Sequence, residues 1–125
     1  MPQPTLVAID DEVEFVKTIA QYFGSRGYVV HVALTGTSGI QLIEAQRPDV
    51  VLMDMKMPGI DGDVALARIR QIDPKVPVIV VTAYSDEGST RDRVLALGAF
   101  AHLEKPLSSM LDLAEVVEQA LASAS

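Results

Sequence analysis

Acidic residues, a hydroxyl and an amine follow four short apolar runs of this 125-residue chain. The acidic residues are Asp10, Asp11 and Asp54, the hydroxyl is that of Thr82, and the amine is that of Lys105. Carboxylates packed together repel one another, and a hard cation such as Mg²⁺ removes that conflict because it prefers carboxylate oxygens and water. A metal ion and an ammonium around one carboxylate, with a hydroxyl nearby, could stabilise a phosphoryl group during its transfer to that carboxylate. Taken singly, each residue could equally be a turn or cap residue, so the chemistry depends on whether the fold brings them together.

The apolar runs predict the strands that would position these groups. Three runs are continuous and rich in β-branched residues, which is typical of strands buried on both faces of a parallel sheet. The run that contains His31 has polar neighbours and is expected at an edge of the sheet, and the last run is the weakest. The five expected strands are Leu6–Ile9, Val29–Val32, Val50–Met53, Val78–Val81 and Ala99–Leu103.

Segments between these runs have apolar residues at helical spacing. Their apolar positions are Phe15, Ile19 and Phe23 with Val16 and Ala20; Ile40, Leu42, Ile43 and Ala45; Ala65, Ile69 and Ile72; and Met110, Ala114, Val117 and Leu121. The expected boundaries are Gly24 and Gly27 for the first helix, Pro48 for the second, and Asp61 or Asp63 and Asp73-Pro74 for the third. Residues 86–97 should form the least anchored helix, because "DEGSTRDR" has no apolar face and only Val94, Leu95 and Leu97 can pack.

Five strands that alternate with five helices predict an α/β fold with a doubly wound parallel sheet and right-handed crossovers. The carboxyl ends of parallel strands lie at one edge of the sheet, where ligands bind, so the polar residues that follow the strands should converge there. We expect residues 1–125 to form one domain, with a structured core at about residues 5–121 and a tail or the start of a linker at 122–125.

The amino-acid composition excludes several kinds of site and argues against several kinds of protein. The chain has no cysteine, which excludes disulfides and thiolate metal sites, and its net charge of −7 argues against direct nucleic-acid binding by this domain. It has no signal-peptide pattern and no apolar run near the ~18 residues of a membrane span. We therefore expect a cytoplasmic protein without a membrane segment.

Four blocks in the sequence, "AIDDE", "VLMDMKMPGIDG", "VIVVTA" and "HLEKP", resemble the signature blocks of the response-regulator receiver domain of two-component signalling. They occur in the family's order and spacing, over nearly the whole chain. The resemblance implies a flavodoxin-like sheet with strand order 2-1-3-4-5 and a cis Lys105-Pro106 peptide bond. Pro58 and Gly59 would form the tight turn that follows the third strand.

The resemblance also assigns roles to the polar residues. It implies that Asp54 is the phospho-acceptor and that Thr82 and Lys105 contact the phosphoryl group. The implied ligands of Mg²⁺ (or Mn²⁺) are Asp10, Asp11, Asp54 and the backbone carbonyl of Lys56. The implied phosphoryl donor is a histidine kinase or a histidine phosphotransfer protein, and the implied output is a partner protein, an attached output domain or a homodimer.

Three further positions bear on the switch that follows phosphorylation and on the lifetime of the phosphoryl group. In the family, the Thr moves toward the phosphoryl group and an aromatic residue three positions before the Lys turns inward, which remodels the face of the fourth helix, fifth strand and fifth helix. Here that position is His102, which either changes environment on activation or is a partly exposed strand residue with no switch role. Lys56 and Tyr84 lie two positions after Asp54 and Thr82, and we expect them to overhang the site and slow attack by water.

Particular residues argue against several other functions. A Mg²⁺-dependent aspartyl phosphohydrolase would carry a general-acid Asp two positions after its nucleophile, where this chain has Lys56, so enzymatic turnover beyond its own phosphorylation and dephosphorylation is not expected. A nucleotide- or flavin-binding module needs a Gly-rich loop where "DDEVE" stands. An EF-hand loop that starts at Asp54 would have Lys56 and Pro58 at ligand positions. A phosphorylation-independent interaction module remains an alternative, although the acceptor site is complete.

Overall fold

The sheet has the expected topology. A computed structural model describes residues 3–83, 86 and 88–123. Within these residues five parallel strands form one sheet in the order β2-β1-β3-β4-β5, so the flavodoxin-like fold is confirmed. The strands are β1 (Thr5–Ile9), β2 (Val29–Ala33), β3 (Val50–Met53), β4 (Val78–Thr82) and β5 (Ala101–Glu104). The strand that contains His31 is β2, and it lies at an edge as predicted.

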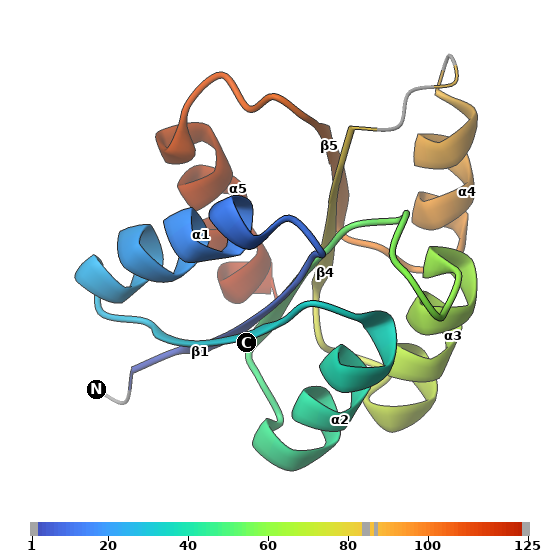
Figure 1. Ribbon diagram of the computed structural model, residues 1–125, viewed down its shortest axis with the longest axis horizontal. Coiled ribbons are helices and arrows are strands. Elements are labelled where there is room, and N and C mark those ends of the chain that lie inside the picture. The colour runs from blue at the N-terminus through green and yellow to red at the C-terminus, as the bar shows by residue number, and fades with distance from the viewer. Residues whose placement is uncertain (1–2, 84–85, 87, 124–125) are drawn as a thin grey trace.

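Helices cover both faces of the sheet. They are α1 (Val13–Ser25), α2 (Gly36–Gln46), α3 (Gly62–Ile72), α4 (Ser89–Ala96) and α5 (Met110–Ser123). Helices α1 and α5 lie on one face, and α2, α3 and α4 lie on the other (Figure 1). Among the described residues, no helix combines the length and apolar character needed to cross a membrane.

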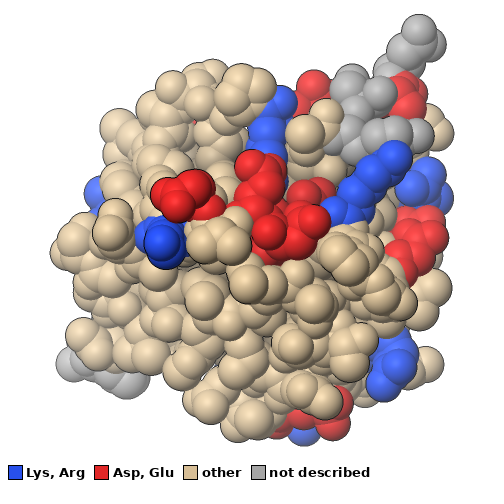
Figure 2. All heavy atoms as spheres, in the orientation of Figure 1, with Lys and Arg blue, Asp and Glu red and all other residues tan. Residues whose placement is uncertain are grey.

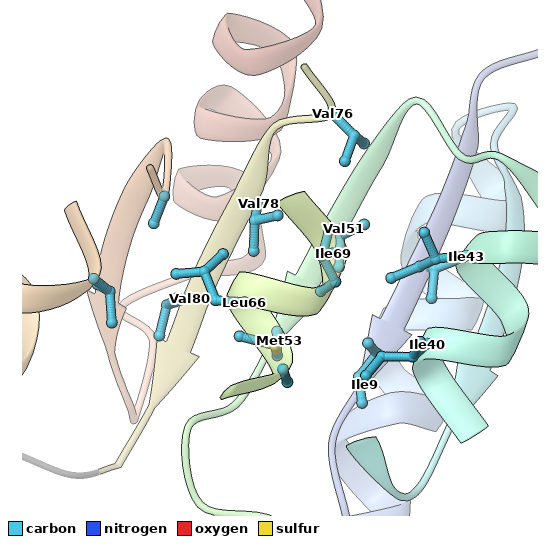
Figure 3. Packing of buried hydrophobic residues seen from close by; sticks show 14 of the residues in the cluster. Ile9, Ile40, Ile43, Val51, Met53, Leu66, Ile69, Val76, Val78 and Val80 are labelled. Carbon is cyan, nitrogen blue, oxygen red and sulfur yellow. The ribbon is translucent and has the colours of Figure 1, made fainter. Parts of the chain in front are cut away.

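Two hydrophobic cores lie on the two faces of the central strands. Every residue of β3 and β4 is buried, and alternate residues of each strand belong to opposite cores, as the two-residue period of a strand requires. Figure 3 shows the core under α2 and α3, where Ile40 and Ile43 lie beside Ile9, and Leu66 and Ile69 pack over the middle of the sheet. This rigid double packing fixes the ends of the strands, where the polar residues stand.

Several predicted helix boundaries are confirmed. Asp61 caps α3, since its carboxylate accepts a hydrogen bond from the backbone N–H of Asp63 at 3.2 Å. Helix α3 ends at Ile72, with Asp73 as its C-cap, and α2 ends one residue before Arg47, ahead of Pro48.

Other boundaries differ from the prediction. Helix α1 continues through Gly24 to Ser25, and the left-handed backbone that follows is at Gly27, whose φ is +93°. Strand β5 begins at Ala101, two residues later than predicted. The prediction that Leu95 and Leu97 pack is wrong: they are 41% and 40% exposed, whereas Val94 is fully buried.

Candidate functional site

The carboxyl edge of the sheet brings four of the predicted polar residues together. Asp10 follows β1, Asp54 follows β3, Thr82 is the last residue of β4, and Lys105 follows β5. Backbone hydrogen bonds extend the ladder into the site: the N–H of Asp54 donates to the carbonyl of Ile9 at 3.0 Å, and that of Lys105 donates to the carbonyl of Thr82 at 2.9 Å. The positions of these residues are therefore set by strand pairing.

Three of these polar side chains are withdrawn from solvent. Asp10 is 2% exposed, Asp54 is 7% exposed and Thr82 is 1% exposed. Burying polar groups costs free energy unless they find partners, and Lys105 is the partner of Asp10 here. Its ammonium lies 2.6 Å from Asp10 Oδ2 and 3.6 Å from Asp54 Oδ2.

Glu12 completes this ionic network, although it is not among the predicted site residues. Its Oε1 atom accepts a hydrogen bond from Lys105 Nζ at 2.7 Å. Burial by itself would lower the pKa of Lys105, but the hydrogen bonds to Asp10 and Glu12, together with the negative charges of Asp10 and Asp54, raise that pKa above its ordinary value. Burial raises the pKa of Asp10, against the opposing effects of its hydrogen bonds from Lys105 and from the backbone N–H of Glu12. The network therefore keeps a positively charged lysine among carboxylates.

The two oxygens of Asp54 have different surroundings. Oδ1 accepts hydrogen bonds from the backbone N–H groups of Met55, at 2.6 Å, and Lys56, at 3.3 Å. Oδ2 is the oxygen nearest Lys105 Nζ. Asp54 also lines a pocket of about 270 Å³ together with Lys56, Thr82 and Ala83. The carboxylate is thus held in one orientation, at the wall of a pocket that also contains a hydroxyl-bearing residue.

A group of carboxylates at this edge could hold a metal ion. Asp10, Glu12 and Asp54 each offer one oxygen, and these oxygens lie within 4.8 Å of one another. Such a donor set suits Mg²⁺, which takes carboxylate oxygens and retains several waters. Figure 2 shows acidic side chains gathered near the middle of one face of the molecule, with basic side chains beside them.

Asp11 lies outside that group of three carboxylates. It is exposed and lines a neighbouring pocket of about 490 Å³ with Lys56, Pro58 and Asp61. Glu12, which the sequence prediction did not name, offers an oxygen close to those of Asp10 and Asp54. A third consecutive acidic residue in "DDE" was the available signal for Glu12.

The remaining predicted positions are distributed around the site. Gly59 has a φ of +94°, as the tight turn after β3 requires, and the Lys105-Pro106 bond is cis, as predicted. His102 is half-buried in β5, and among the described residues no hydrogen-bond partner reaches its Nε2 atom. Tyr84 lies outside the described residues.

Sequence comparison supports the same family over most of the chain. The family model described as the response regulator receiver domain matches residues 6–118. The sporulation initiation phosphotransferase F of Bacillus subtilis is 33% identical over 106 residues, which are 85% of this chain and 85% of that protein. The regulatory protein AtoC of Escherichia coli is 35% identical over 116 residues, which are 93% of this chain and only 25% of AtoC.

Solved structures agree in fold. A CheY-like response regulator receiver domain protein from Methanospirillum hungatei superposes with a TM-score of 0.91 at 26% identity, covering 98% of this chain and 96% of that one. A response regulator receiver domain protein from Clostridium thermocellum gives a TM-score of 0.89 at 30% identity, and the match covers 96% of this chain and 95% of that one. The sheet order, the polar cluster at its carboxyl edge and these matches together place this chain in the response regulator receiver domain family.

Proposed function

We propose that this chain accepts a phosphoryl group on Asp54 from a histidine kinase or a histidine phosphotransfer protein. The supporting observation is the geometry of Asp54. One carboxylate oxygen is held by two backbone N–H groups, while the other lies 3.6 Å from a buried ammonium. A carboxylate whose orientation is fixed and whose charge is partly compensated is prepared to act as a nucleophile.

The transfer exchanges one phosphorus bond for another. An oxygen of Asp54 attacks the phosphorus of the donor's phosphohistidine, a new O–P bond forms, and the N–P bond breaks with its electron pair left on the imidazole. Lys105 is positioned to neutralise phosphoryl oxygens, and Thr82, at the wall of the same pocket, can donate its hydroxyl to one of them.

Receiver domains bind Mg²⁺, and the carboxylates at this edge fit such an ion. We propose Asp10, Asp11, Asp54 and the backbone carbonyl of Lys56 as the residues that hold it, with Glu12 next to them. When bound, Mg²⁺ (or Mn²⁺) would neutralise the carboxylates and the transferring phosphoryl group.

The proposed output is a change of the α4-β5-α5 face. A phosphoryl group adds negative charge beside Thr82, and movement of Thr82 and His102 would carry the change to α4 and β5. The receiver family interacts with histidine kinases and with output domains. We propose residues 1–125 as one receiver unit that acts through a partner protein or an attached domain, since the chain spans most of one relative and a quarter of another.

Mass spectrometry tests the assignment of Asp54. The intact protein is incubated with acetyl phosphate and Mg²⁺, and wild type is compared with Asp54→Asn and with Asp112→Asn, which removes an exposed carboxylate on α5. We expect one added phosphoryl group on wild type and on Asp112→Asn, and none on Asp54→Asn. Equal labelling of all three proteins would place the acceptor elsewhere.

A further inference from the structure

The ammonium of Lys105 is held mainly from the α1 side of the site. It donates to Asp10 Oδ2 at 2.6 Å and to Glu12 Oε1 at 2.7 Å, and it lies 4.3 Å from the centre of the Phe15 ring. Asp54 Oδ2, at 3.6 Å, lies beyond the usual hydrogen-bond distance. In this state the lysine is therefore bound more closely to α1 and the loop before it than to Asp54.

The position of Glu12 in α1 does not by itself account for this contact. Glu12 is the N-cap residue of α1, yet its side chain makes no capping hydrogen bond. Glutamate is not one of the residues preferred at an N-cap, where Ser, Thr, Asp and Asn predominate. The carboxylate instead extends to Lys105, with 60% of the Glu12 side chain exposed and only 9% of the lysine side chain exposed. Glu12 thus forms the solvent-facing rim of the lysine's binding site.

We propose that Glu12 is a positioning residue that retains the Lys105 ammonium on the α1 side and competes with phosphoryl oxygens for it. The proposal rests on the function proposed above for Asp54 and Lys105. An ammonium has three N–H donors, and two of them already serve Asp10 and Glu12. A phosphoryl group on Asp54 must draw the ammonium toward itself, and a charge-assisted bond to a carboxylate resists that movement more than a bond to a neutral group does.

The first test observes the lysine directly, without metal or phosphoryl donor. The ¹⁵N-labelled ammonium of Lys105 is followed by nuclear magnetic resonance in wild type, in Glu12→Gln and in Glu14→Gln. Glu14 is a matched control, because it lies in the first turn of α1 with a 90% exposed side chain and pairs only loosely with Lys17, at 3.9 Å.

We expect the Lys105 ammonium signal to shift and its protons to exchange faster in Glu12→Gln, and to stay as in wild type in Glu14→Gln. A wild-type Lys105 signal that exchanges as fast as that of the exposed Lys75 would contradict the proposal. A signal that Glu12→Gln leaves unchanged would contradict it as well.

The second test measures the affinity for beryllofluoride, a phosphoryl mimic, at saturating Mg²⁺. We expect Glu12→Gln to bind it about 3- to 10-fold more tightly than wild type, as loss of one competing charge-assisted hydrogen bond would allow, and Glu14→Gln to change the affinity less than about 2-fold. In a Lys105→Met background the gain in beryllofluoride affinity from Glu12→Gln should fall below about 2-fold, because the ammonium for which Glu12 and the mimic compete is absent.

Each result of the second test bears on one proposal. An unchanged or weaker affinity in Glu12→Gln, or a gain that persists without Lys105, overturns the positioning role. Absence of beryllofluoride binding by wild type would instead count against the proposed function, while the ammonium measurement still decides whether Glu12 retains the lysine.

Discussion

Helices α3 and α4 are neighbours on the same face of the sheet, yet they are attached in different ways (Figure 1). Helix α3 has 11 residues and α4 has 8. The buried residues of α3 are Gly62, Ala65, Leu66 and Ile69, whereas those of α4 are Thr90 and Val94. Apolar burial therefore holds α3 much more strongly than α4.

Polar contacts supply much of what holds α4. Arg93 Nε lies 2.8 Å from Asp63 Oδ2 on α3, and Asp86 accepts hydrogen bonds from the backbone N–H of Thr90 at 2.8 Å and from its hydroxyl at 2.6 Å. Such contacts can be exchanged for contacts with water without leaving a cavity, unlike apolar packing. A helix held in this way can take a second arrangement at small cost, so the comparison favours α4 over α3 as the moving element of the proposed switch.

The largest expected effect comes from removing apolar packing under α3. Leu66→Ala should lower the free energy of unfolding by about 2–5 kcal/mol, because Leu66 is fully buried between α3 and the sheet. Urea denaturation measures this. The matched variant Leu95→Ala, on α4, should cost less than about 0.5 kcal/mol because that side chain is 41% exposed. Similar losses for the two variants would remove the contrast between the helices.

A smaller effect should follow from breaking the ion pair between α4 and α3. Arg93→Gln should lower the global free energy of unfolding by no more than about 1 kcal/mol, because the side chains of Arg93 and Asp63 are 45% and 32% exposed. Amide exchange in α4 should nevertheless become faster, while exchange in α3 stays unchanged. Arg91→Gln is the control, since Arg91 pairs with Asp92 inside α4. If it accelerates exchange as much as Arg93→Gln does, the pairing between the helices is not what holds α4.

The smallest effect concerns pH. Hydrogen bonds from Thr90, first from its hydroxyl and then from its backbone N–H, hold the pKa of Asp86 below its ordinary value of 3.8. Because the pKa is lower in the folded state, this contact stabilises the start of α4 above pH 3.8 and is lost as pH falls through the lowered pKa. The Thr90 amide shift should therefore titrate below pH 3.8 in wild type, and closer to 3.8 in Thr90→Val. A wild-type midpoint at or above 3.8 would contradict the stabilising role of this contact.

Strand patterns and strand-end residues were predictable for a physical reason. Asp10, Asp54 and Lys105 follow strands and Thr82 ends one, and a parallel sheet must bring such positions to one edge. The strand order and the cis bond before Pro106 came from the resemblance, because alternating strands and helices do not determine either.

The contact between Glu12 and Lys105 was not predictable in the same way. It depends on the direction in which the chain enters α1 and on where a long side chain ends, neither of which a sequence pattern specifies. The exposure of Leu95 and Leu97 was missed for a similar reason, since a helix with so few apolar residues does not reveal which side faces the sheet.

We propose that the state of Asp54 is transmitted to α4 and not to α3. Hydrogen exchange of both helices, measured with and without beryllofluoride in the presence of Mg²⁺, tests it most directly, with Asp54→Asn as the control. We expect the mimic to change exchange in α4 several-fold, to leave α3 unchanged, and to have no effect on either helix in Asp54→Asn. Bound mimic with no change in α4, or with equal changes in α3 and α4, would contradict the claim.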